Sequence, residues 1–150
     1  MEFRSLREPD LTQLLALYRQ LDPKDKETLL TDAATRWRQI RNIPGSDIIV
    51  GCLDGRIVTS CTLIVIPNIT RGGSPYALIE NVVTDAACRN RGFGKTLLQQ
   101  AAQRAWDAGC YKVMLLTGSN KPETLAFYEK AGFEQNKTGF QMRRLPPRTE

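Results

Sequence analysis

The sequence predicts an α/β protein, in the broad sense that includes α+β folds, with a central mixed sheet and helices on both faces. Two β-branched segments, 47–53 and 56–67, are joined by Asp54-Gly55, which is a strong hairpin signal. A strand over 76–84, a helix and a further strand then follow in the order of a strand-helix-strand crossover. Hairpins give antiparallel pairs and the crossover gives a parallel one, so the sheet is mixed.

The remaining elements follow from apolar periodicity and from turn residues. Residues 2–7 form a first strand, and a second helical segment over 27–40 ends before Pro44-Gly45. Between them, a helix starts at Asp10 and ends before Pro23. Its expected apolar face is Leu11, Leu14, Leu15, Tyr18 and Leu21.

In the second half of the chain, glycines mark the ends of the expected helices. A helix over about 92–108 is closed by Gly109, a strand spans 112–117, and a helix over about 121–131 is closed by Gly132. Residues 133–144 are expected to form a final pair of short strands. The face of the first of these helices that packs on the sheet is expected to hold Leu97, Leu98, Ala101, Ala102, Ala105 and Trp106.

Size and composition fit one domain over residues 1–150, 41% hydrophobic, which we expect to be soluble and cytoplasmic. The chain has neither a signal-peptide layout nor an apolar run long enough for a membrane span, so no membrane partner is expected. The net charge of +5 is spread along the sequence and mixed with sixteen acidic residues. No nucleic-acid-binding module accompanies it, so a phosphate-rich cofactor or an anionic substrate accounts for the surplus equally well.

The cysteines carry no predicted chemistry. Four cysteines occur without a CxxC spacing, and the sequence has no histidine, so no metal site is expected and no cysteine has a histidine to activate it. Pairing about the Asp54-Gly55 turn sets Cys52 opposite Ile57, not Cys61. We therefore expect four reduced thiols.

The segment from Arg89 to Thr96 predicts an anion site, because it lies between a strand and the start of a helix, where free N–H groups and the positive end of the helix dipole converge. Gly92 and Gly94 let the backbone approach a phosphate closely. The cations are Arg89, Arg91 and Lys95, and the intervening residues are Asn90, Phe93 and Thr96.

Other interpretations of this turn are weaker. A P-loop needs glycine where Arg89 stands, and the dinucleotide fingerprint needs three glycines where two are present. A helix start with solvated arginines and no ligand stays open for the turn taken alone. A second motif downstream separates these alternatives, Leu125-Ala126-Phe127-Tyr128-Glu129-Lys130-Ala131-Gly132-Phe133.

Together, the two motifs resemble the GNAT superfamily of N-acetyltransferases over about residues 79–144. The resemblance implies the GNAT acyl-CoA N-acyltransferase fold, with acetyl-CoA as cosubstrate and its pyrophosphate on the turn Arg89 to Lys95. The run Ile79 to Thr84 looks like glucosamine 6-phosphate N-acetyltransferases, and aminoalkylphosphonate N-acetyltransferases look similar too. One departure is that many members carry an asparagine where this chain has Lys121 or Thr124; Asn120 is expected to cap the helix instead.

The resemblance also implies roles for individual residues. Backbone N–H groups of Val82, Val83 and Thr84 would hold pantetheine and polarise the thioester carbonyl. Tyr128 would protonate the leaving thiolate. Glu80, a carboxylate in an otherwise apolar strand, is expected to have its pKa raised by burial and to act as a base; it could equally bind the substrate together with Asn81, or be solvated.

The acceptor stays open at this point. A small-molecule primary amine that bears phosphate or phosphonate is expected, such as the amino sugar phosphate glucosamine 6-phosphate. The expected anion contacts, which no pattern singles out, are Arg71, Arg143, Arg144 and the segment 23–26. A protein or peptide N-acetyltransferase and a non-catalytic acyl-CoA-binding module are the alternatives. The acceptor pocket is expected to be built by residues 20–45 and 68–76, and a homodimer is one of the oligomeric states expected from the family.

Overall fold

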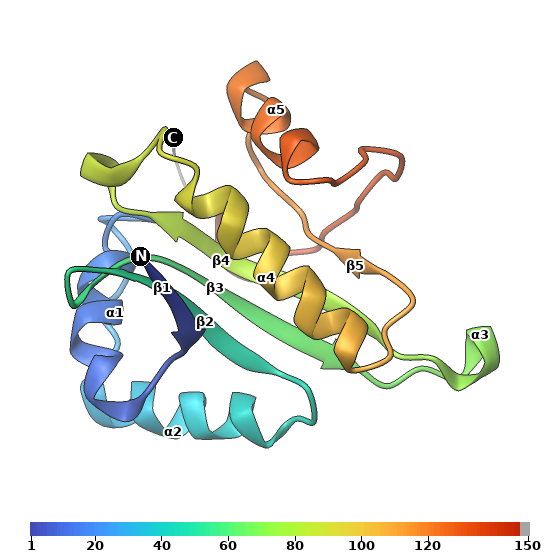
Figure 1. Ribbon diagram of the computed structural model, residues 1–150, viewed down its shortest axis with the longest axis horizontal. Helices are drawn as coiled ribbons and strands as arrows, with labels where there is room; N and C mark the ends of the chain where they lie inside the picture. Colours follow the sequence, from blue (N-terminus) through green and yellow to red (C-terminus); the bar gives the residue numbers. More distant parts are fainter. Residues whose placement is uncertain (148–150) are drawn as a thin grey trace.

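The computed structural model describes residues 1–147 and contains one five-stranded sheet in the order β1-β2-β3-β4-β5 (Figure 1). All neighbouring strands are antiparallel except β4 and β5, which are parallel. The strands are β1 (Glu2–Ser5), β2 (Asp47–Leu53), β3 (Arg56–Ile66), β4 (Tyr76–Thr84) and β5 (Val113–Met114). The helices are η1 (Glu8–Asp10), α1 (Leu11–Tyr18), α2 (Leu30–Asn42), α3 (Thr70–Gly73), η2 (Ala86–Cys88), α4 (Phe93–Asp107) and α5 (Pro122–Lys130).

The hairpin predicted from Asp54-Gly55 is confirmed, and so is its register. Cys52 lies opposite Ile57, and Cys61 pairs with Ile49. The four cysteines are free and buried. The mixed sheet is confirmed as well, because the parallel pair forms where the crossover was expected.

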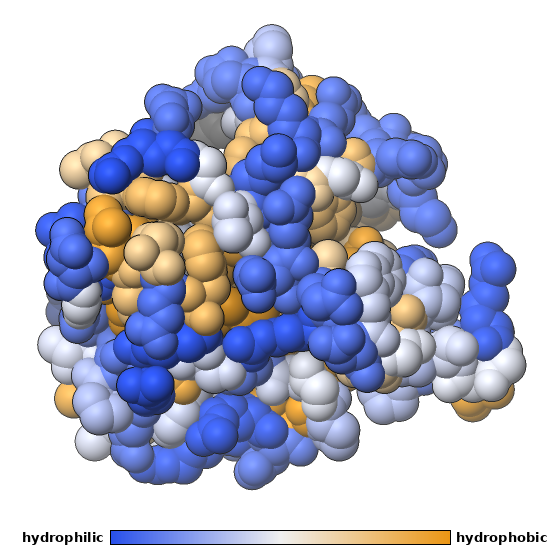
Figure 2. Space-filling view, in the orientation of Figure 1, coloured by the Kyte–Doolittle hydropathy of each residue, from blue (hydrophilic) through white to orange (hydrophobic). Residues whose placement is uncertain are grey.

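Two hydrophobic cores lie on opposite faces of the sheet. On one face, α4 packs with Leu97, Leu98 and Ala101 against a cluster that includes Cys61 and Leu63 of β3. Figure 2 shows hydrophilic side chains along the exposed side of this helix. On the other face, α1 and α2 contribute the large apolar side chains of a second cluster, Leu11, Leu14, Leu17 and Trp37.

Three expected core positions differ. Leu17, not Leu15, completes the buried stripe of α1. On α4, Ala102 is only partly buried and Trp106 is 48% exposed, because each lies beside the stripe of Leu98, Ala101 and Ala105 that faces the sheet. Gly109 closes the helix with a positive φ of 83°, as predicted.

The expected strands over 133–144 are absent from the described residues, so that prediction is wrong. This segment is irregular, and the strand that it would extend, β5, is only two residues long. Phe140 and Met142 are 93% and 101% exposed, since this chain offers them no core to pack against. The segment still passes close to the chain after β5, because a Cβ at Gly139 would lie 2.7 Å from Leu116 Cδ2.

The second helix also starts later than expected, at Leu30 instead of residue 27. Leu29 is extended, and the first helical hydrogen bond runs from the Ala33 N–H to the Leu29 carbonyl. Asp32 lies in the first turn, where its negative charge interacts favourably with the positive end of the helix dipole. Residues 19–29 therefore form a loop that connects α1 and α2.

Candidate functional site

Strands β4 and β5 separate along the sheet and leave a gap between them. Only Ala77 and Leu78 of β4 pair with β5, opposite Val113 and Met114, whereas β4 continues to Thr84. The β5-facing edge of β4 beyond Leu78 therefore has backbone N–H and C=O groups without a neighbouring strand. Such an edge can hydrogen-bond an extended ligand that has amide groups; the binding of pantetheine here, which the resemblance implies, stays a prediction.

A β-bulge lies in β4 beside this gap. Thr62 of β3 pairs with Glu80 and Ser60 pairs with Val83, so two residues of β4 face one residue of β3. Asn81 has a φ of 53°, in the left-handed region that asparagine adopts more readily than most non-glycine residues. The bulge turns the peptide groups of Asn81 and Val82 out of the regular ladder. Sequence reasoning named both residues but not the bulge.

The predicted anion turn has the geometry expected of it. Gly92 is the N-cap of α4 with a φ of 81°, and the first helical bond runs from the Thr96 N–H to the Gly92 carbonyl over 3.1 Å. Within residues 1–147, no backbone carbonyl accepts from the N–H groups of Phe93, Gly94 or Lys95. Three donors and the helix dipole therefore converge at the mouth of the turn.

The charges around the turn are positive and uncompensated. Arg89, Arg91 and Lys95 are exposed, and no ion pair to a described carboxylate neutralises them. The first turn of α4 carries no acidic residue. The Arg89 Nε donates to the Thr84 carbonyl over 3.2 Å, which ties the turn to the end of β4, and Arg91 lies 4.8 Å from the Phe93 ring centroid.

Gly94 brings three elements of the site together. It is buried, and a Cβ at this position would lie 3.0 Å from Phe127 Cζ and 3.2 Å from Thr84 Oγ1. The Thr84 hydroxyl is itself held 2.9 Å from the Thr59 hydroxyl. The start of α4, the end of β4 and the helix α5 thus meet at this glycine. The sequence predicted its approach to a ligand, but not its contact with Phe127.

Other residues of the predicted cofactor site have mixed environments. Val82 is half-buried and packs against the α4-side core, whereas the Val83 side chain is buried in the core on the opposite face. Asn90 is exposed with a φ of 60°, which lets the chain turn before Gly92. The side chains of these residues are structural, and the predicted contacts of Val82 and Val83 concern their backbone alone.

Tyr128 lies on α5 against the α4-side core. Its ring centroid is 5.0 Å from that of Phe127 and 6.3 Å from that of Phe133. Burial raises the pKa of the Tyr128 phenol, and the nearby Cys61 thiol raises it further. The phenol therefore stays protonated at neutral pH, as a proton donor must.

Glu80 differs from its expectation, because its side chain is exposed and not buried. Its neighbour Ile79 points into the α4-side core, so Glu80 points to the opposite face, beside Thr62. Glu80 and Tyr128 therefore flank β4 from opposite faces of the sheet. The proposed burial of Glu80 as the reason for base strength is wrong; solvation was the alternative that the sequence left open.

Asn120 does not cap α5, which corrects another expectation. The N-cap is Lys121, with extended backbone and no capping side chain, and Pro122 occupies the first helical position. The Ser119 Oγ instead accepts from the Lys121 N–H over 3.3 Å. The nitrogen of Pro122 carries no hydrogen and needs no hydrogen-bond acceptor, so this helix start depends less on a capping side chain.

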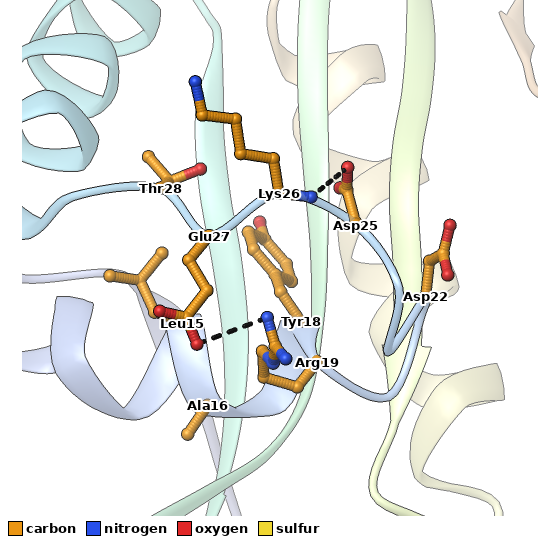
Figure 3. Close-up of a pocket in the computed structure, with 9 residues that line it drawn as sticks. All are labelled: Leu15, Ala16, Tyr18, Arg19, Asp22, Asp25, Lys26, Glu27 and Thr28. Carbon is orange, nitrogen blue, oxygen red and sulfur yellow. Dashed lines mark hydrogen bonds and ion pairs between the residues drawn. The ribbon is translucent and has the colours of Figure 1, made fainter. Parts of the chain in front are cut away.

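A pocket of about 330 Å³ lies between α1 and the loop after it (Figure 3). In Figure 3, the Tyr18 ring extends from α1 beneath the loop, and Arg19 forms an ion pair with Glu27 over 3.4 Å. The lining residues are Leu15, Ala16, Tyr18, Arg19, Asp22, Asp25, Lys26, Glu27 and Thr28. Five of its lining residues fall within 20–45 and none within 68–76, so the acceptor pocket expected from both segments stays a prediction.

The structure does not bring the expected anion contacts together. Figure 1 shows α3, which carries Arg71, at the far end of the sheet from α1. The Arg71 guanidinium lies 5.3 Å from the Tyr111 ring centroid, and Arg143 donates to the Leu145 carbonyl. Of the basic residues expected as anion contacts, only Lys26 lines the pocket. Within residues 1–147 there is no group of three or more metal-binding side chains and no helix suited to span a membrane.

Comparisons with known proteins show which proteins this chain is similar to. A glucosamine 6-phosphate N-acetyltransferase of Trypanosoma brucei brucei is 43% identical over 79 residues, 53% of this chain and 52% of that protein. A probable glucosamine 6-phosphate N-acetyltransferase 2 of Oryza sativa subsp. japonica is 39% identical over 59% of this chain and 51% of that protein. The chain therefore matches about half the length of these curated relatives.

Among solved structures, a putative acetyltransferase from Agrobacterium tumefaciens has a TM-score of 0.90 and 46% identity, and the match covers 96% of this chain and 100% of that one. The model of the acetyltransferase (GNAT) family matches residues 11–133. This match spans most of both cores, the anion turn and the helix that carries Tyr128. The chain is a member of the acetyltransferase (GNAT) family.

Proposed function

We propose that the protein is an acetyl-CoA-dependent N-acetyltransferase that acts on a primary amine of a small molecule. The observation that carries this proposal is the start of α4, where three free N–H groups and three unpaired cations adjoin the gap between β4 and β5. The diphosphate of coenzyme A has the charge for this turn, and its pantetheine arm has amides for the open edge of β4. The four buried free thiols favour a reducing compartment such as the cytoplasm.

The chemistry that we propose is direct transfer in a ternary complex. The amine nitrogen attacks the thioester carbonyl, the bond between carbon and sulfur breaks, and the thiolate takes a proton from Tyr128. Backbone N–H groups at the bulge next to Asn81 would stabilise the oxyanion. The exposed carboxylate of Glu80 would accept the amine proton through water or bind the ammonium group of the acceptor.

For the acceptor, we propose an amino sugar phosphate such as glucosamine 6-phosphate. The names of the relatives from Trypanosoma and rice support this class. The charge of the pocket beside α1 does not select a phosphate, because Arg19 is paired with Glu27 and three carboxylates face two cations in its lining. A long open groove would favour a peptide acceptor. The absence of a proton donor would favour a non-catalytic module, and the presence of Tyr128 argues against such a module.

We further propose that two copies associate through the C-terminal segment. Phe140 and Met142 alternate with polar residues and are almost fully exposed, and Gly139 before them lies close to Leu116, which follows β5. In a symmetric pair, the same segment of each copy would cover that of the other. Light scattering should therefore give the mass of a dimer, and Phe140→Asp should give the mass of a monomer; a monomeric wild type would refute this.

Thiol release from acetyl-CoA, followed with DTNB, tests the activity. The panel should hold glucosamine 6-phosphate, aminoethylphosphonate, spermidine and a short peptide. Release with the first acceptor is expected, and Tyr128→Phe should lower kcat about 10- to 100-fold with an unchanged acetyl-CoA affinity. Gly92→Asp, which brings a negative charge to the turn, should abolish binding by calorimetry. Retained binding in Gly92→Asp would refute the donor site, and full turnover in Tyr128→Phe would refute the proton donor.

A further inference from the structure

A buried threonine of β3, Thr59, lies beside the end of β4. It is fully buried and points to the same face of the sheet as Cys61 and Leu63, which belong to the α4-side core. Its methyl group packs over Gly51 of β2, because a Cβ at that glycine would lie 2.6 Å from Thr59 Cγ2. A hydroxyl in these surroundings is costly unless it is hydrogen-bonded, and a valine would fill the same space without that cost.

The Thr59 hydroxyl has two partners, and both are at the end of β4. Its Oγ1 donates to the Val83 carbonyl over 3.0 Å and lies 2.9 Å from the Thr84 Oγ1. Because the hydrogen of Thr59 is used in the first of these bonds, the Thr84 hydroxyl is the donor in the second. One side chain of β3 therefore fixes both the peptide group between Val83 and Thr84 and the side chain of Thr84.

The backbone of Thr84 faces the gap between β4 and β5. The next residue, Asp85, bonds across to β3, since its N–H donates to the Val58 carbonyl over 2.8 Å. Backbone groups alternate between the two edges of a strand, so the N–H and C=O of Thr84 point away from β3. On that edge the Arg89 Nε donates to the Thr84 carbonyl over 3.2 Å. The Thr84 N–H and the Arg89 guanidinium thus both depend on how the Thr84 backbone is held.

We propose that Thr59 is a positioning residue for the acyl donor. Its hydroxyl holds the peptide group that presents the Thr84 N–H to pantetheine, and the Thr84 carbonyl in turn holds Arg89 beside the turn that takes the diphosphate. Thr59 is buried and touches no part of the donor, so it acts through Thr84 alone. This inference rests on the proposed use of acetyl-CoA.

Two substitutions at Thr59 separate the hydroxyl from the packing. Thr59→Val keeps the branched shape and removes the hydroxyl, whereas Thr59→Ser keeps the hydroxyl and removes the methyl group over Gly51. Calorimetry with coenzyme A should give a Kd about 2- to 10-fold higher for Thr59→Val, the range expected for one lost hydrogen bond, and a near wild-type Kd for Thr59→Ser. Circular dichroism melts should show that both variants fold, with a lower Tm for Thr59→Ser because a buried methyl group is lost.

The comparison of Kd with Tm distinguishes positioning from a role in stability alone. If Thr59 only stabilised the fold, the affinity would follow the Tm and not the hydroxyl. A wild-type Kd in Thr59→Val would overturn the inference, as would a Kd raised equally in both variants. Thr35→Val is the matched control, because Thr35 is exposed on α2 and donates only to the Thr31 carbonyl, so the Kd should not change. A wild type that does not bind coenzyme A would instead contradict the proposed function.

A double-mutant cycle tests the link to Arg89. In the Arg89→Ala background, Thr59→Val should raise the Kd for coenzyme A by a smaller factor than in the wild type, because one of the two groups that Thr59 positions is then missing. The same factor in both backgrounds would overturn the part of the inference that concerns Arg89.

Discussion

Gly94→Ala tests whether α4 and α5 are in contact through a site that admits no side chain. In an open helix position, this change stabilises a protein by about 1 kcal/mol, because alanine has the higher helix propensity. At Gly94, the new methyl group would lie 3.0 Å from Phe127 Cζ and 3.2 Å from Thr84 Oγ1, which is closer than carbon atoms normally approach.

The contact decides the sign of the effect. Overpacking of a core costs about 1–3 kcal/mol, so the net change is a loss of about 0–2 kcal/mol. For a chain of this size, 1 kcal/mol corresponds to about 2–4 °C, so the Tm should fall by up to about 8 °C. Because Phe127 precedes Tyr128, the displaced helix should also lower kcat.

A double-mutant cycle with Phe127→Leu isolates the contact. The leucine removes the ring edge that meets the new methyl group, so Gly94→Ala should be neutral or stabilising in that background. Circular dichroism melts of the four proteins measure the coupling. A Tm that rises by about 2–4 °C in both backgrounds would show that alanine is accommodated freely and would refute the predicted contact.

Two predictions concern groups outside the transfer chemistry. Burial raises the pKa of Cys61 to about 12, and all four thiols are buried. The native protein should therefore react slowly with DTNB, and all four thiols should react only in denaturant. Fast reaction of the native protein would contradict this prediction. The Arg4 guanidinium lowers the pKa of Asp10 below its ordinary value of 3.8. The ion pair therefore stabilises the folded protein above pH 3.8, and this stabilisation is lost as the pH falls through the lowered pKa. The difference in Tm between the wild type and Asp10→Asn should shrink over that range, and a difference independent of pH would exclude the ion pair as its cause.

The parts of the fold that sequence reasoning predicted correctly depend on local rules. The Asp54-Gly55 turn fixes the register of β2 and β3, because a two-residue turn determines which residues face each other. The start of α4 is equally local, since Gly92 and the residues around it set the N-terminus of the helix within a few positions. The element order and the anion turn therefore needed no knowledge of distant parts of the chain.

The features that were missed depend on contacts between distant residues. The bulge at Asn81 arises from the pairing of β4 with β3, and an asparagine within a strand was its only local sign. The exposure of Glu80 depends on which face of β4 is covered, which no local pattern states. The strands expected over 133–144 need a neighbour, and two residues of β5 do not provide one within this chain.

The short pairing of β4 with β5 has a consequence for local stability. The chain beyond Met114 is joined to the sheet through the two register pairs of β5, and its packing on the α4-side core comes from Leu115, Phe127, Tyr128, Ala131 and Phe133. A unit held by so few contacts opens at a lower free energy than the rest of the molecule, and its amides should exchange with solvent first. A donor bound in the gap would touch both sides and so slow that exchange, which makes α5 the part of the protein whose rigidity depends most on the ligand.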